Sequence, residues 1–91
     1  MTGRSDRLHR HRRKVTLYKA AGCHLCERAR AQLAELHEEL EFELHEIDIT
    51  GDRELEARYR ELIPVVEIDG VREFVYYLQP EAFRRKVQRA R

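Results

Sequence analysis

The chain has 91 residues, of which 38% are charged, and a formal net charge of +1. A chain of this length buries only one compact core, which limits it to a single small domain. Basic and acidic residues are nevertheless distributed unevenly along the chain. Residues 1–14 carry six basic side chains and one acidic one, whereas residues 15–91 carry 12 basic and 16 acidic ones. The sequence therefore predicts a basic tail, residues 1–14, and a mildly acidic domain, residues 15–91.

The tail lacks the apolar character of a secretory signal. Its one aliphatic residue after Met1 is Leu8, whereas a signal peptide needs an apolar region of about 7–15 residues. No stretch approaches the roughly 20 apolar residues of a membrane span. We expect a disordered, solvated arm, with a transit peptide or weak, unspecific contact with nucleic acid as alternatives. With no signal peptide and two cysteines, the expected location is the reducing cytoplasm.

The first half of the domain predicts a strand, a helix and a second strand. Residues 15–20, VTLYKA, are β-branched and aromatic and precede Gly22, which is typical of a strand. Residues 42–49, FELHEIDI, predict another strand. Between them, from His24 onward, apolar residues recur at three- and four-residue steps and predict one amphipathic helix. The members of this stripe are Leu25, Ala29, Leu33, Leu36 and Leu40.

The second half predicts a short helix, a hairpin and a last helix. Asp52 suits the N-cap of the short helix, whose apolar residues are Leu55, Tyr59 and Leu62. Residues 64–68 and 71–78 flank Asp69-Gly70, which favours a type I′ hairpin turn. Pro80 suits the first position of a helix over residues 80–90. The order β-α-β-α-β-β-α predicts an α/β fold: a mixed four-stranded sheet flanked by helices, with a parallel first β-α-β unit and an antiparallel hairpin at its end.

The two cysteines occupy the junction between the first strand and the first helix. Cys23 and Cys26 are three residues apart, a spacing that places two side chains on one helix face with Cβ atoms about 5–6 Å apart. Cys23 stands at the mouth of the helix, where unpaired N–H groups and the helix dipole favour a thiolate. Cys26 is expected to be shielded by the helix. We therefore predict that Cys23 attacks a disulfide and that Cys26 resolves the mixed disulfide.

Other interpretations of the cysteines remain open at this point. A structural zinc site needs a second C-x-x-C motif or paired histidines, but the chain has no other cysteine and His9 and His11 lie in the tail. A metal or cluster would have to be shared between two chains. Two inert core thiols are a further alternative. Nearby, His24 either stabilises the Cys23 thiolate or is simply exposed, and Lys19 either adds positive potential for substrate binding or is an exposed strand-end lysine.

The succession of a strand, Gly-Cys-x-x-Cys at a helix start and Ile-Pro-Val-Val before an Asp-Gly hairpin resembles the glutaredoxin branch of the thioredoxin superfamily. It is most similar to small bacterial glutaredoxin-like proteins with a Cys-His-Leu-Cys site, over residues 15 to about 87. The resemblance implies a thioredoxin-like fold and a cis-proline at Pro64. It also implies that the backbone of Ile63, just before this proline, hydrogen-bonds an extended substrate as an added strand.

Two departures from the family concern glutathione. The resemblance implies a basic residue three positions before the nucleophile, where this chain has Ala20 and Lys19 is one step off. It also implies a Gly-rich turn and an aspartate before the last helix, to hold the γ-glutamyl group of glutathione. Residues 76–83, YYLQPEAF, contain neither. These departures predict weak glutathione binding.

The predicted function is thiol–disulfide oxidoreduction by the Cys23-Cys26 dithiol on protein or low-molecular-weight disulfides. The expected partners are such a disulfide and a reductase or thiol electron donor, with glutathione as an undecided co-substrate and with no tightly bound cofactor, specific nucleic acid or membrane. The expected state is a monomer. The alternative is a thioredoxin-fold binding module that holds a metal or iron–sulfur cluster through the cysteines, or docks a partner without turnover.

Overall fold

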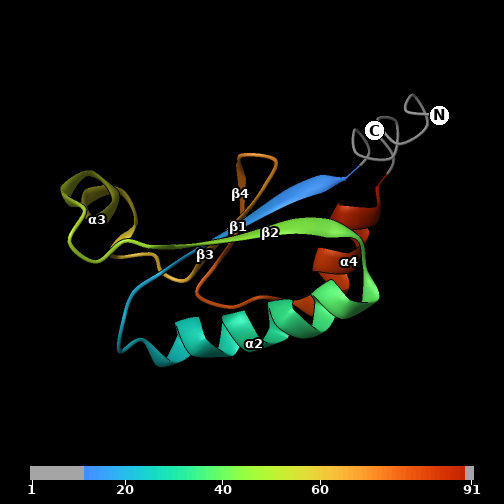
Figure 1. Ribbon diagram of the computed structural model, residues 1–91, viewed down its shortest axis with the longest axis horizontal. Coiled ribbons are helices and arrows are strands. Elements are labelled where there is room, and N and C mark those ends of the chain that lie inside the picture. Colours follow the sequence, from blue (N-terminus) through green and yellow to red (C-terminus); the bar gives the residue numbers. More distant parts are fainter. Residues whose placement is uncertain (1–11, 90–91) are drawn as a thin grey trace.

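The computed structural model describes residues 12–89 (Figure 1). The elements follow the predicted order and are β1 (Arg13–Lys19), α2 (His24–Glu39), β2 (Phe42–Asp48), α3 (Arg53–Tyr59), β3 (Val65–Ile68), β4 (Val71–Val75) and α4 (Pro80–Gln88). The predicted tail ends too late, because Arg13 and Lys14 already pair with β2 as part of β1. Residues 1–11 of the tail lie outside the described residues. Among residues 12–89, no helix has the length and apolar composition to cross a bilayer.

The four strands form one mixed sheet in the order β2-β1-β3-β4. β1 runs parallel to β2 and antiparallel to β3, and β3 and β4 form the antiparallel hairpin. Asp69 and Gly70 have φ values of 52° and 82°, as a turn with two left-handed residues requires. β4 ends at Val75, short of the predicted residue 78, because Tyr76 has a φ of 70° and turns the chain out of the strand.

The main core lies between one face of the sheet and the helices α2 and α4 (Figure 1). The predicted helical stripe is confirmed for Ala29, Leu33 and Leu36, which are at most 3% exposed, whereas its outer members Leu25 and Leu40 are only partly buried. The three buried members pack with Val15 and Leu17 of β1, and Phe83 of α4 closes the same cluster. Burying one such side chain contributes roughly 1.5–3 kcal/mol. This packing fixes the start of α2 against the end of β1.

A second, smaller core lies on the opposite face, because residues alternate across a strand. Ile49, Tyr59 and Val65 form it, with Tyr18 packed against them. The Tyr18 and Tyr59 rings stack with centroids 4.0 Å apart. The Tyr59 hydroxyl donates to Glu67 Oε2 at 2.9 Å, and burial raises the pKa of Tyr59 above its ordinary value. α3 therefore covers this face from the end of the sheet at which β1 finishes.

Candidate functional site

One edge of the sheet brings three chain segments together. Tyr18 pairs with Val65, and Val65 pairs with Val75. The chain therefore leaves β1, enters β3 and leaves β4 at the same edge. The segments that meet there are the loop to α2 with its cysteines, the turn that ends in Pro64, and the β4–α4 loop that begins at Tyr76.

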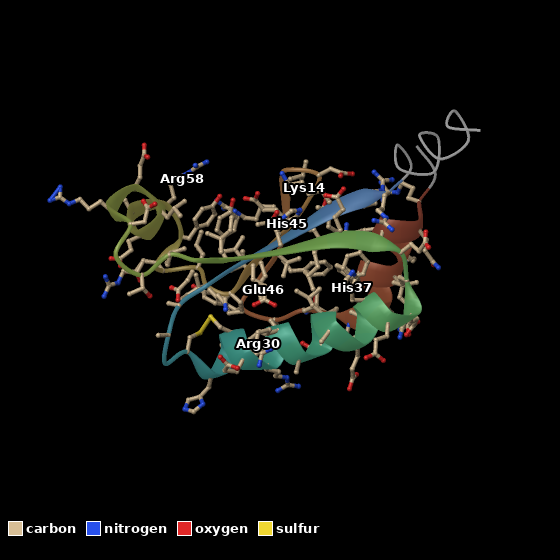
Figure 2. The ribbon with its side chains drawn as sticks, in the orientation of Figure 1. Lys14, Arg30, His37, His45, Glu46 and Arg58 are labelled. Carbon is tan, nitrogen blue, oxygen red and sulfur yellow. A yellow bond between two sulfur atoms is a disulfide. The ribbon has the colours of Figure 1, made fainter. Side chains whose placement is uncertain are left out.

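The cysteines occupy the first turn of α2. Cys23 and Cys26 form a disulfide, with Cα atoms 5.2 Å apart, and Figure 2 shows it at the start of the helix. Cys23 is the N-cap, and its Sγ accepts a hydrogen bond from the Cys26 backbone N–H at 3.1 Å. Cys23 is partly exposed, whereas Cys26 is only 1% exposed. The sulfurs therefore differ in access and surroundings, as the helix position predicts.

Gly22 makes the turn that delivers Cys23 to the helix. Its φ is 76°, in the left-handed region that glycine enters without steric cost. A Cβ built on Gly22 meets no other atom within 4 Å. The glycine is therefore required by the backbone conformation and not by crowding around the cysteines.

Pro64 is buried just before β3, and the Ile63–Pro64 peptide bond is cis. The Ile63 N–H donates to the Tyr59 carbonyl oxygen at 3.1 Å. The Pro64 carbonyl accepts from the Tyr76 N–H at 2.8 Å. Within residues 12–89, the Ile63 carbonyl accepts no hydrogen bond. Of the backbone groups of Ile63 expected to contact a substrate, the N–H is therefore already engaged and the carbonyl is open.

Lys19 and His24 differ in their surroundings. The Lys19 ammonium pairs with Glu46 at 3.1 Å, and their side chains are 26% and 34% exposed. This pairing compensates the positive potential expected of Lys19. Figure 2 shows Glu46 on the α2 side of β2. His24 is exposed at the first position of α2 and forms no hydrogen bond or ion pair with another described residue.

Glu46 was missed in the sequence. A signal was present, since Phe42 and Leu44 alternate toward the main core and Glu46 continues that alternation. The Glu46 side chain is 34% exposed, so the alternation places a charge at the rim of the core, where a neighbouring strand can offer an opposite charge. Lys19 at the end of the neighbouring strand offers that charge.

The β4–α4 loop was predicted as strand and is instead a turn that presents two tyrosines. Tyr76 is 43% exposed and Tyr77 is 56% exposed. The Tyr76 hydroxyl donates to the Glu61 carbonyl at 2.6 Å, and the Tyr77 N–H donates to the Val75 carbonyl at 2.7 Å. The signal that could have identified the turn is the pair of consecutive aromatic residues, since alternation would bury one of them.

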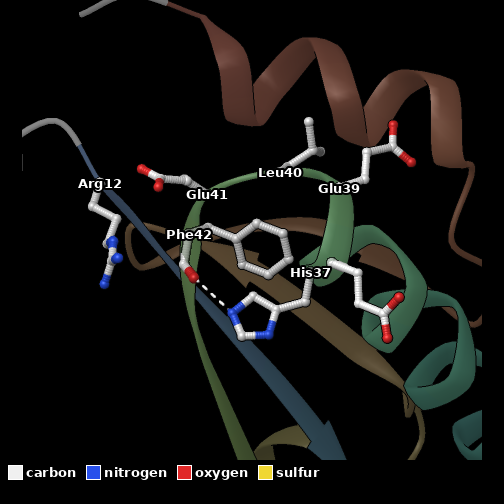
Figure 3. A pocket seen from close by; sticks show the side chains of 7 residues that line it. Arg12, His37, Glu39, Leu40, Glu41 and Phe42 are labelled. Atoms are coloured by element: carbon white, nitrogen blue, oxygen red, sulfur yellow. Dashed lines mark hydrogen bonds between the residues drawn. The ribbon is translucent and has the colours of Figure 1, made fainter.

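A pocket of 460 Å³ lies at the other end of α2 and is lined by Arg12, His37, Glu38, Glu39, Leu40, Glu41 and Phe42 (Figure 3). His37 Nε2 donates to the Phe42 carbonyl at 2.9 Å, and the two rings lie 4.8 Å apart. These contacts hold the helix end against β2. The pocket contains no cysteine, so it is separate from the cysteine site.

The described residues provide no cluster of metal ligands near the cysteines, as the metal-binding alternative would require. Across residues 12–89, no three side chains of His, Cys, Asp or Glu gather as metal ligands. Any metal bound by Cys23 and Cys26 would therefore need ligands from elsewhere, for example from a second copy of the chain.

Comparison with solved structures identifies the fold. A protein of Nitrosomonas europaea superposes with a TM-score of 0.73 at 30% identity, covering 85% of this chain and 93% of that one. A thioredoxin of Fasciola hepatica superposes with a TM-score of 0.60 at 20% identity, covering 99% of this chain and 93% of that one. At such low identity the thioredoxin likeness concerns the fold alone. The mixed sheet and its helices are thus thioredoxin-like.

Relatives in sequence point to the same group. Uncharacterized proteins of Mycobacterium bovis and Mycobacterium tuberculosis are 42% identical over 71 residues, which is 72% of this chain and 72% of each relative. The family of glutaredoxin-like domains (DUF836) matches residues 14–88, a span that includes β1 from Lys14 onward, the other three strands and both cysteines. The chain belongs to this glutaredoxin-like domain family.

Proposed function

We propose that the protein is a thiol–disulfide oxidoreductase that reduces protein or small disulfides with Cys23 and Cys26. The observation that carries this proposal is the asymmetry of the pair. Cys23 is partly exposed at the mouth of α2, and Cys26 is buried one turn inside it. A thiolate at a helix N-terminus is stabilised by backbone N–H groups, and one such donor, the Cys26 N–H, already points at the Cys23 sulfur.

The reaction starts from the reduced dithiol. The Cys23 thiolate attacks one sulfur of the substrate disulfide, a Cys23–substrate disulfide forms, and the other substrate sulfur leaves as a thiolate that takes up a proton. Cys26 then loses its proton and attacks the Cys23 sulfur. The second substrate thiol is released, and the Cys23–Cys26 disulfide forms. The substrate gains two electrons and two protons, which a dithiol or glutathione-type thiol donor restores to the enzyme.

The turn before Pro64 is the proposed substrate groove. It meets the cysteine loop at one sheet edge. Because the Ile63 N–H is engaged by Tyr59, the open Ile63 carbonyl is the group that accepts a hydrogen bond from an extended substrate. His24, at the first position of α2, and Lys19, at the end of β1, are the further residues that we propose contact the substrate. We place this chemistry in the cytoplasm and with no prosthetic group.

Trapping experiments test the assignment. In Cys26→Ser, the mixed disulfide has no resolving thiol, so an adduct on Cys23 should accumulate with a disulfide substrate. Cys23→Ser should accumulate none. Intact-mass spectrometry without reductant reads both, and the wild-type protein, which should show only a transient adduct, is the control. An adduct on Cys26 in Cys23→Ser would reverse the two roles.

The same preparation separates redox turnover from metal binding. Absorbance and metal analysis of the purified protein should show no stoichiometric metal or cluster, and pre-reduced protein should reduce a disulfide. Stoichiometric metal together with no disulfide reduction would establish the binding module in place of the oxidoreductase.

A further inference from the structure

Tyr76 adopts a backbone conformation that bulky residues rarely enter. Its φ is 70°, and a positive φ is a genuine outlier for such a side chain. Two hydrogen bonds hold it there. Its N–H donates to the Pro64 carbonyl at 2.8 Å, and its hydroxyl donates to the Glu61 carbonyl at 2.6 Å. Both acceptors belong to the turn of the proposed substrate groove, so the ring of Tyr76 is fixed beside that groove.

Tyr77 is presented from the same short turn. Its N–H donates to the Val75 carbonyl at 2.7 Å. The next residue, Leu78, is 6% exposed, and its carbonyl accepts from Gln32 Nε2 of α2 at 3.4 Å. The loop is therefore anchored on both sides of Tyr77, while the Tyr77 side chain is 56% exposed. The backbone that presents the Tyr77 ring is therefore already held in place before any partner arrives.

Exposed large apolar side chains are few in the part of the chain that the structure describes. Within residues 12–89 they are Val71, Tyr76 and Tyr77. Val71 begins β4, beside the hairpin turn, whereas both tyrosines follow the other end of that strand. Two of the three thus lie at the edge that holds the cysteine loop and Pro64. Exposed tyrosines beside a reactive group are typical of docking surfaces, because a rigid ring supplies apolar area and a polar tip.

The chemistry of the loop disfavours a small anionic ligand. The Tyr76 and Tyr77 N–H groups donate internally, and Pro80, at the first turn of α4, has no N–H to offer. Glu81 adds a carboxylate to that turn, 81% exposed and paired with Arg84. A carboxylate ligand therefore meets a like charge at this position and cannot use the N–H groups of Tyr76 and Tyr77 or find one at Pro80.

We propose that Tyr76 and Tyr77 dock an extended polypeptide that carries an apolar side chain next to its disulfide, and so select protein disulfides over glutathione disulfide. This rests on the proposed function. The tyrosine rings would pack against the apolar side chain of the polypeptide, while a backbone N–H of the polypeptide donates to the Ile63 carbonyl. Tyr76 holds the turn of Glu61 to Pro64, and Tyr77 is the residue whose ring is free to contact the partner.

The test is a single-turnover reaction that needs no external donor. Pre-reduced protein is mixed with an oxidised peptide disulfide that has leucine beside its cysteine, with glutathione disulfide, or with bis(2-hydroxyethyl) disulfide, and formation of the Cys23–Cys26 disulfide is followed by acid quench and alkylation. The wild type should favour the peptide. The Tyr77→Ser variant should react with the peptide about tenfold more slowly than wild type, measured as the second-order rate constant, which is the loss expected of one aromatic docking residue. Its rate constant with bis(2-hydroxyethyl) disulfide should change less than about twofold.

Two further variants serve as controls. Tyr77→Phe keeps the ring and should retain the peptide rate. Val71→Ser removes an equally exposed apolar side chain from the far end of the hairpin and should also retain it. Equal rates of Tyr77→Ser and wild type with the peptide, equal losses on both substrates, or a wild-type preference for glutathione disulfide would overturn the docking surface while leaving the oxidoreductase intact. A wild type that reduces none of the three would overturn both.

Discussion

At the scale of single residues, the two sulfurs have different roles because of where α2 begins. Cys23 is outside the helix as its N-cap, so its sulfur receives the Cys26 N–H. Cys26 is inside the helix and faces the core at 1% exposure. Burial in apolar surroundings disfavours a thiolate, whereas the helix terminus favours one. The helix start thus separates an attacking sulfur from a resolving sulfur within three residues.

This separation predicts unequal alkylation of the reduced protein. Cys23 should react with iodoacetamide well below pH 8.5, the approximate pKa of a free cysteine, because the helix terminus stabilises its thiolate. Cys26 should react slowly. Rates measured against pH in Cys23→Ser and Cys26→Ser report each thiol alone, and denatured samples of both variants give the reference rate. Similar rates for both thiols in the folded variants would remove the basis for the assigned roles.

At the scale of elements, an ion pair fastens the end of α2 to α4. Arg84 of α4 donates to both carboxylate oxygens of Glu39, at 2.7 and 3.1 Å, and also to Glu81 at 2.8 Å. The hydrogen bond from Arg84 holds the pKa of Glu39 below its ordinary value. The folded state therefore favours the charged carboxylate, so the contribution is present at neutral pH and disappears as pH falls below the range in which Glu39 ionises.

Replacing this glutamate should lower stability in a pH-dependent way. Glu39→Gln should melt at a lower temperature than wild type at pH 7, and the difference should narrow between pH 7 and pH 3, as the pH falls toward the lowered pKa of Glu39. Glu38→Gln is the matched control, because Glu38 is an exposed neighbour with no ion pair among the described residues. Thermal melts followed by circular dichroism at both pH values give the comparison. A difference that persists unchanged at low pH would assign the effect to packing.

Most element boundaries could be predicted because local signals agree with the packing. The stripe through Leu33 specified α2, and Asp52 caps α3 by accepting from the Leu55 N–H at 3.1 Å. Asp69-Gly70 formed the expected turn. The site was less predictable, since the Lys19–Glu46 pair and the Tyr76 turn depend on partners from other segments. Tyr76 has strong strand propensity, and only its bonds to Glu61 and Pro64 override it.

At the scale of the whole molecule, basic residues are concentrated at both ends of the sequence. Residues 1–14 and 84–91 together carry 11 of the 18 basic residues and one of the 17 acidic ones. A hydrogen bond from the Arg13 guanidinium to the Arg89 carbonyl joins the start of β1 to the end of α4. The seven residues of β1 span about 20 Å, more than two Debye lengths of about 8 Å at physiological salt. Arg13 and Arg89 therefore contribute little attraction for anions at the cysteines.

Two truncations should distinguish the tail from the sheet. Deleting residues 1–11 should leave melting temperature and disulfide reduction nearly unchanged, because that segment adds almost no apolar surface. Deleting residues 1–13 should lower the melting temperature by about 2–5 °C, because it removes the exposed ion pair between Arg13 and Asp69. Calorimetry of both proteins beside wild type gives the answer. An equal loss in both truncations would place a stabilising contact in residues 1–11.

The bond between Arg13 and Arg89 has a practical consequence for engineering the chain. The first strand begins and the last helix ends at neighbouring positions, at the opposite end of β1 from the cysteines. A short linker would therefore suffice to close residues 13–89 into a ring without crossing the reactive edge. Ring closure restricts the unfolded chain more than the folded one, so a cyclised variant should gain stability while its dithiol stays open to substrates.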